Sequence, residues 1–292
     1  MVNRENSKKD TELNELIENV NKSDISSIKE VIMQLFTVFN NPKSSALDLK
    51  NIIQKDPPLS TRLLKLANST YYSGNRRITE IQEAIVRIGF SAAKEVAFSQ
   101  KVCELFQKDV NIEGYSRIAL WENSIAVALC CKLIYMREFK KSGEHLYIMG
   151  LLHNVGIIIE DQFQQNRFKA ALVQSRKEKC NLQYAEKNIL GFDHADIGRA
   201  ISDNWGFPDE LVIAIGNHHE PLIVDDKFKK YTLTLYISDY ICQKNNIGYC
   251  DAPYENQLLY SKCLSELNIQ EEAMNLIIKD VHYELKKMGE RG

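Results

Sequence analysis

The sequence is poor in residues that break helices. Its 292 residues include only 13 glycines and six prolines, and no convincing run of alternating polar and apolar residues is present. These absences favour long helices over many short strands. The chain also lacks an internal repeat and a low-complexity tract, and its 44% hydrophobic and 26% charged residues are typical of a folded globular protein. The sequence therefore predicts an all-α fold.

Paired cysteines are missing as well. The chain has seven cysteines, an odd number, and none of them forms a CxxC pair, which argues against both a disulfide framework and a zinc knuckle. We expect reduced, mostly buried thiols. Residues 1–21 contain no apolar segment of the kind found in secretory signals, so the expected location is the cytoplasm.

A strong charge of one sign and a long apolar run are also absent. The net charge is −2 and the sequence pI is about 6.3, so no overall field draws the chain to nucleic acid or to anionic lipid. Residues 145–159 contain no Asp, Glu, Lys or Arg, but they fall short of the roughly 18 apolar residues that span a bilayer. We expect one buried core helix there, with no nucleic-acid partner and no membrane partner.

The pattern of helix signals divides the chain into three parts. Residues 1–22 are dominated by charge and predict a frayed or weakly helical polar lead. Residues 23–110 carry apolar residues at helical spacing and no histidine, which indicates a helical packing and recognition part. Residues 111–292 contain all six histidines. In these two parts Asp56 and Asp193 are each predicted to cap the start of a helix.

Five residues of the third part have the chemistry of a metal site. Neutral imidazoles and a carboxylate from several helices are what a transition-metal ion needs, and such an ion can activate water and neutralise a phosphate. A single histidine on an apolar helix is more often a satisfied core or surface residue, so the set carries the hypothesis rather than any one member. The candidates are His153, His194, His218, His219 and Asp239.

Three ordered motifs resemble those of the HD superfamily and, within it, the HDOD domain family, which is related to the HD-GYP proteins. Residues 54–69 contain an Asp-Pro turn followed by a predicted helix that ends in Ala-Asn-Ser, and residues 81–89 are similar to the next family element. Residues 191–221 contain Asp-His-Ala, Trp-Gly-Phe-Pro and His-His-Glu-Pro, which resemble the later element. The resemblance covers nearly the whole chain. It implies an HD-superfamily-like helical bundle with an N-terminal helical subdomain and a role in bacterial signal transduction.

The chain departs from catalytic HD proteins at two positions. In those relatives a histidine stands in the helix before a His-Asp pair, and the matching residue here is Asn123. The aspartate of the pair is replaced by Asn154. Because these amides supply neither an imidazole nor a negative charge, the resemblance implies that the first metal site retains only His153 and Asp239.

A second site built from His194, His218 and His219 could still hold one divalent transition metal, and no other cofactor is expected. The alternative is a buried hydrogen-bond network, which the amides of Asn123 and Asn154 suit because each both donates and accepts. We expect no catalytic residue. The sequence thus predicts a non-catalytic regulatory module that binds a protein partner or a small signalling ligand. The competing interpretation is a weak metal-dependent phosphohydrolase or cyclic-dinucleotide phosphodiesterase.

Overall fold

Helices form nearly all of the regular structure in the computed structural model, which describes residues 2–72, 76–107, 110–253 and 256–291. The one pair of strands in these ranges is the short antiparallel ladder of β1 (Asn111–Ile112) and β2 (Tyr115–Ser116). The predicted all-α fold is confirmed.

The chain divides into two units. The larger unit comprises Met1–Asp24 and Phe106–Val281, and the smaller unit comprises Ile25–Leu105 and His282–Gly292. Each unit therefore combines segments from distant parts of the sequence.

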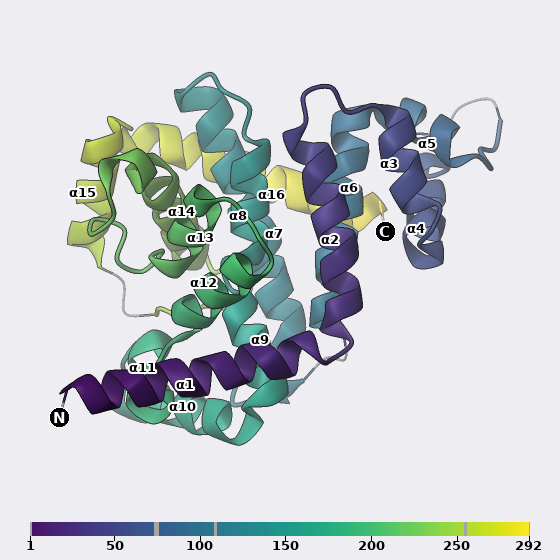
Figure 1. Cartoon of the computed structure of the whole chain (residues 1–292). Helices are drawn as coiled ribbons and strands as arrows, with labels where there is room; N and C mark the ends of the chain where they lie inside the picture. Colours follow the sequence, from purple (N-terminus) through teal and green to yellow (C-terminus); the bar gives the residue numbers. More distant parts are fainter. Residues whose placement is uncertain (1, 73–75, 108–109, 254–255, 292) are drawn as a thin grey trace. The chain divides into compact units, whose positions relative to one another are not determined.

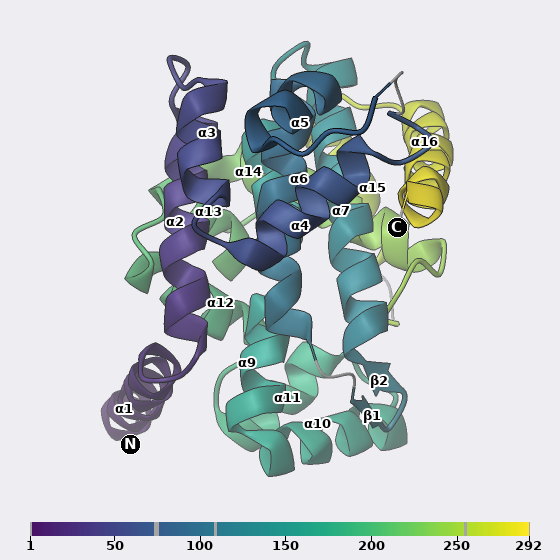
Figure 2. The ribbon, with the colours of Figure 1, turned by 90° about the vertical axis from the view of Figure 1, so that its right-hand side faces the viewer.

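The smaller unit is built around α6. This helix packs against α2 and α4, and α5 packs against α4 (Figure 2). The predicted cap at Asp56 is confirmed, because its Oδ1 accepts a hydrogen bond of 3.0 Å from the amide of Leu59 and two prolines follow in the first turn. The helices are α2 (Ile25–Asn40), α3 (Ala46–Ile53), α4 (Pro57–Ala67), α5 (Ile81–Ile88) and α6 (Phe90–Cys103), and the 3-10 turn η1 (Glu104–Phe106) follows.

The larger unit is built around α7, which packs against α8 and α14 (Figure 1). A second group of contacts joins α12 to α9 and α13. The helices are α1 (Val2–Asn21), α7 (Arg117–Glu138), α8 (Glu144–Leu152), α9 (Val155–Phe163), α10 (Gln165–Glu178), α11 (Leu182–Leu190), α12 (His194–Asn204), α13 (Asp209–Gly216), α14 (Asp226–Lys244), α15 (Gln257–Leu267) and α16 (Glu271–Arg291), whose last part belongs to the smaller unit.

The polar N-terminal segment is more ordered than its charge predicts. It forms the helix α1, which contacts α9 and α12. Leu16, Ile17 and Val20 are buried, and Lys9 pairs with Asp196 at 2.8 Å. The expectation of a frayed or weakly helical lead is therefore wrong, because a short apolar stripe near the end of the helix is enough to dock it.

The expected single helix over residues 145–159 is also wrong. It is broken into α8 and α9 at His153 and Asn154, and Asn154 leaves helical geometry with φ −99° and ψ 18°. The direction of α9 is set by packing: a Cβ on Gly156 would lie 2.0 Å from the carbonyl oxygen of His194. The break places His153 at the turn between two core helices.

One helix among the described residues, α7, is long and apolar enough by length and composition to cross a membrane. Its apolar window is 67% buried inside the fold. A core helix of a globular unit has the same properties, and the packing of α7 against α8 and α14 agrees with that interpretation.

Candidate metal centre

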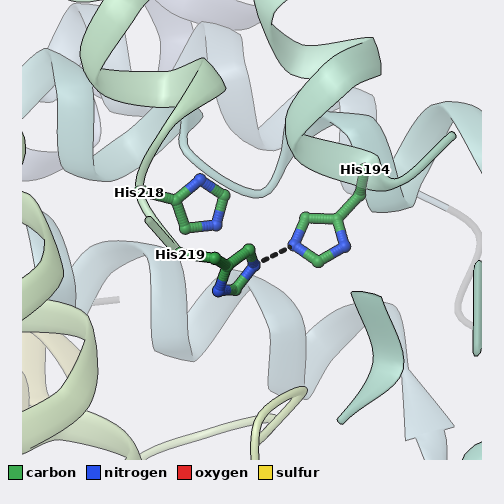
Figure 3. Close-up of side chains that lie close together, drawn as sticks. All are labelled: His194, His218 and His219. Atoms are coloured by element: carbon green, nitrogen blue, oxygen red, sulfur yellow. Dashed lines mark hydrogen bonds between the residues drawn. The ribbon is translucent and has the colours of Figure 1, made fainter. Parts of the chain in front are cut away.

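The predicted histidines come together in the larger unit. His194 is the first residue of α12, and His218 and His219 follow the end of α13. One ring nitrogen from each lies within 4.8 Å of the others (Figure 3). The rings of His153 and His218 are 5.4 Å apart between centroids, and His153 Nε2 lies 3.5 Å from Asp239 Oδ1. We call these five residues the histidine centre.

His194 is positioned by the cap of its own helix. Asp193 Oδ1 accepts a hydrogen bond of 2.8 Å from the amide of Asp196, whose side chain accepts one of 3.2 Å from the amide of Asp193. This reciprocal arrangement is the capping box, and it confirms the predicted cap. It fixes the first turn of α12 and with it the direction of the imidazole.

Replacing Asp193 by alanine is expected to lower the free energy of unfolding by about 1 kcal/mol more than replacing it by serine. Serine retains an oxygen that can cap the helix, whereas both variants remove the 3.0 Å ion pair with Lys187. The difference between the two variants, measured by urea unfolding, therefore isolates the cap. Equal stability of the two would contradict a capping role.

The proton positions on two imidazoles follow from their partners. His153 Nδ1 lies 2.7 Å from the carbonyl oxygen of Gly150, and His218 Nδ1 lies 2.6 Å from that of Ile215. A carbonyl oxygen only accepts, so each Nδ1 carries a hydrogen, and the neutral form of each ring presents a lone pair at Nε2. Both Nε2 atoms are buried and have no hydrogen-bond partner in the described part of the chain. Burial, with the neighbouring His153 and His194, lowers the pKa of His218 to about 4.

His194 lies between carboxylates and a second imidazole. Its Nδ1 donates to Glu186 Oε2 at 2.7 Å, and its Nε2 lies 2.7 Å from His219 Nε2 and 3.3 Å from Asp251 Oδ2. Burial lowers the pKa of His194, but the two carboxylates outweigh burial and raise it well above its usual value. Burial and the nearby His218 hold the pKa of His219 well below its usual value. His194 Nε2–H therefore donates to His219 Nε2.

A second buried acid, Glu160, lies next to Glu186. Glu160 of α9 is fully buried, and its burial, together with the nearby Glu186, raises its pKa well above the usual value. Among the described residues, no donor reaches either oxygen of Glu160 or Oε1 of Glu186. A neutral Glu160 resolves this, because its own O–H can donate to Glu186.

Gln243 links the two aspartates of the site. Its Nε2 donates to Asp239 Oδ2 and to Asp251 Oδ1, each at 2.7 Å. The other oxygens, Asp239 Oδ1 and Asp251 Oδ2, are buried and accept no hydrogen bond from the residues described. Burial raises the pKa of the Asp251 carboxyl, but the imidazoles of His194 and His219 outweigh it and hold that pKa below its usual range.

The two asparagines do not hydrogen-bond to the histidines. Asn123 donates from Nδ2 to the carbonyl oxygen of Ile247 at 3.4 Å. Asn154 is 1% exposed, and neither atom of its amide has a partner within the described ranges. The hydrogen bonds of the centre therefore join His194 to His219 and to Glu186, and neither asparagine takes part in them.

The residues of the centre fit a divalent transition-metal ion. Three members of the centre, His153, His218 and Asp239, and the neighbouring Asp251 each have a buried nitrogen or oxygen with no hydrogen-bond partner among the described residues. Nδ1 of His153 and of His218 is held by a carbonyl oxygen. Metal-bound histidines are usually oriented in this way by an acceptor on the other ring nitrogen. When bound, such an ion supplies Lewis-acid polarisation and can lower the pKa of a coordinated water.

Sequence reasoning missed Glu186, Glu160, Gln243 and Asp251. Asp251 and the two glutamates are among 39 acidic residues in the chain, and neither spacing nor a motif distinguishes them from the others. The only available signal was that buried imidazoles usually have acidic or carbonyl partners, which does not say which acids supply them.

The comparisons with known proteins agree with this architecture. A family model described as the HDOD domain matches residues 25–221. An HDOD domain protein of unknown function from Geobacter sulfurreducens aligns with a TM-score of 0.72 and 23% identity, over 90% of this chain and 89% of that one. A protein from Shewanella amazonensis SB2B, named as a candidate phosphohydrolase, aligns with a TM-score of 0.68 and 21% identity, over 96% and 94% of the two chains.

Two further relatives are longer than this chain. A candidate signal transduction protein from Marinobacter aquaeolei VT8 aligns with a TM-score of 0.74 and 20% identity, over 90% of this chain and 58% of that one. An uncharacterized protein from Treponema pallidum (strain Nichols) is 23% identical over 255 residues, which is 85% of this chain and 47% of that protein. The chain thus spans about half the length of that curated relative.

Proposed function

Because this chain belongs to the HDOD domain family, we propose that it is a non-catalytic signal-transduction module that binds a protein partner or a small signalling ligand. The observation that carries the proposal is the closure of the histidine centre. Side-chain exposure is 0% for His153 and His194, 8% for Asp239 and 11% for His219. Hydrolysis needs an open position at which a substrate can reach the ion. A centre this closed supports ion binding without turnover.

The residue after His153 also supports the proposal. Asn154 stands where the resemblance to catalytic relatives places an aspartate, and its buried amide is neutral. A neutral amide does not hold a pair of cations together as a bridging carboxylate does. The binding of a partner or ligand is proposed because the chain belongs to the family. The lack of catalytic turnover is proposed because the histidine centre is closed.

The test is a turnover assay on protein treated with a chelator and reloaded with Mn²⁺, Fe²⁺ or Ni²⁺. We expect no release of product from bis(4-nitrophenyl) phosphate, nucleotides or a cyclic dinucleotide above the buffer rate. Metal-dependent turnover that His218→Ala abolishes and His282→Ala retains would overturn the proposal. His282 is the matched control because it is exposed on α16.

The second candidate is a weak metal-dependent phosphohydrolase. Its support is the convergence of unpartnered nitrogen and carboxylate lone pairs in one buried centre. The same assay decides between the two functions, because this candidate requires turnover with at least one of the three ions.

A further inference from the structure

We propose that Asp251 is the carboxylate ligand of a divalent transition-metal site whose imidazole ligands are His194, His218 and His219. Residues 245–251, which follow α14, deliver this carboxylate, and we call them the Asp251 loop. The inference is independent of the non-catalytic proposal, because ion binding and turnover are separate measurements.

The side chain of Asp251 reaches the three histidines. Its Oδ2 lies 3.3 Å from His194 Nε2 and 3.6 Å from His219 Nε2. The residue is 2% exposed, and Oδ2 has no hydrogen-bond donor aligned with it in the described ranges. The unpartnered Nε2 of His218 belongs to the same cluster. A buried carboxylate oxygen that faces ring nitrogens without an aligned hydrogen bond lies where a cation would stabilise it.

The Asp251 loop is held so that the carboxylate cannot turn away. The amide of Leu182, at the start of α11, donates to the carbonyl oxygen of Asp251 at 2.8 Å. Gln243 donates to Asp251 Oδ1 at 2.7 Å and accepts from the amide of Ala252 at 3.1 Å. With the backbone and Oδ1 both fixed, Oδ2 points to the imidazoles before any ion arrives.

The same loop rests on α7 at Asn123. The amide of Tyr249 donates to the carbonyl oxygen of Ala119 at 2.8 Å, and Asn123 Nδ2 donates to Ile247 at 3.4 Å. A Cβ on Gly248 would lie 2.4 Å from the backbone nitrogen of Asn123, and the φ of Gly248 is +74°, so this approach requires glycine. Asn123, which supplies no imidazole, thus helps to hold the loop that supplies a carboxylate.

The ligand set also fits by charge and type. Binding of the ion displaces the Nε2 proton of His194 to solvent. Three neutral imidazoles and one carboxylate then give an N₃O set with one negative charge, and first-row divalent ions accept both donors. Asp251 provides the negative charge that Asn154 does not. Glu186 completes the arrangement, because a carboxylate on His194 Nδ1 orients that ring and increases its basicity.

The experiment measures Co²⁺ binding to the chelator-treated full chain, by visible absorption and by metal analysis. We expect one ion per chain, and we expect Asp251→Asn to weaken Co²⁺ binding by on the order of 100-fold. Asp226→Asn is the matched control, because its side chain is 93% exposed, and it should bind like the wild type. Unchanged Co²⁺ affinity in Asp251→Asn, or no binding by the wild type, would overturn the assignment.

A second variant separates the two aspartates that Gln243 joins. Asp239 Oδ1 lies 3.5 Å from His153 Nε2, and His153 is not among the three ligand histidines, so Asp239→Asn should weaken Co²⁺ binding by no more than about 10-fold. If Asp239→Asn loses more affinity than Asp251→Asn, the ion is held on the His153 side and the assignment is wrong.

Hydrogen exchange gives a readout that needs no variant. If Asp251 binds the ion, Co²⁺ should slow exchange of the Tyr249 and Leu182 amides, because both hold the Asp251 loop in place. Exchange that is unchanged on Co²⁺ addition, in wild-type protein shown to bind the ion, would overturn the proposal even if Asp251→Asn did not fold. Neither result bears on turnover, so failure here leaves the proposed function standing.

Discussion

Replacing Glu186 by glutamine is expected to lower the free energy of unfolding by about 3 kcal/mol, whereas replacing Glu160 by glutamine should change it by less than about 1 kcal/mol. The two residues have the same side chain and are both fully buried. Only their partners differ, so the pair tests the assigned proton positions directly.

The physical reason is the charge that each group carries. Glu186 Oε2 accepts hydrogen bonds from Nδ1 and from the backbone amide of His194, at 2.7 and 3.0 Å. Replacing Glu186 by a neutral glutamine leaves the buried, positively charged ring of His194 with one neighbouring carboxylate fewer, which destabilises the fold. Burial and the nearby Glu186 raise the pKa of Glu160 well above the usual value, so we expect this side chain to carry a proton. Glutamine copies the shape of a protonated glutamic acid and can donate to Glu186 as that acid does.

The measurement is urea unfolding of both variants at neutral pH in the presence of chelator. Co²⁺ affinity provides a second readout. Glu186→Gln should weaken it by about 10- to 100-fold, because Glu186 accepts the hydrogen bond that orients His194, a proposed ligand. Equal losses of stability in the two variants would contradict the assigned proton positions, and a larger loss in Glu160→Gln would indicate that the proton lies on Glu186 instead.

Replacing Lys101 by alanine is expected to lower the free energy of unfolding by about 3 kcal/mol. Lys101 Nζ lies 2.7 Å from Asp56 Oδ2 and 2.8 Å from Glu104 Oε2, and the Lys101 side chain is 9% exposed. Asp56 also caps α4, the helix that carries the first family motif. Loss of the Lys101 ammonium group leaves this capping carboxylate without its cation. Breaking a buried pair leaves the remaining charges uncompensated.

Lys55→Ala is the matched control, because Lys55 is exposed in the same unit and should lose less than about 0.5 kcal/mol. Equal stability of the two variants in urea unfolding would contradict the assignment.

The contribution of Lys101 also has a predicted pH dependence. Burial lowers the pKa of Lys101, but Asp56 and Glu104 outweigh it and raise the pKa above 10.5. A raised lysine pKa stabilises the fold fully below its unfolded value and loses that effect as the pH passes above the folded value. The stability difference between wild type and Lys101→Ala should therefore be constant at neutral pH and shrink above pH 10.5.

The sequence predicted those features of the fold that depend on neighbouring residues. The caps at Asp56 and Asp193 are confirmed because a cap needs only a side-chain oxygen and an amide about three residues later. The helix over residues 145–159 failed for the opposite reason. Its break depends on the close approach of Gly156 to the backbone of His194, which no local pattern describes.

The candidate site shows the same division. The four histidines and Asp239 were predicted as a set from their chemistry and from the resemblance, and the structure brings them into one centre. Glu186, Gln243 and Asp251 were not predicted. Their distances to the imidazoles depend on how α11, α14 and the Asp251 loop pack, and a carboxylate in a loop has no periodicity that reveals its direction.

By itself the sequence determined that this protein is helical, where two of its helices begin and which imidazoles are candidate ligands, since capping, periodicity and side-chain chemistry are local properties. Only the tertiary structure decided which carboxylates face those imidazoles, which nitrogen carries each proton and how far the centre is closed to solvent. These properties depend on the burial of each side chain and on distances between residues that are far apart in the chain, and both are determined only when the chain folds.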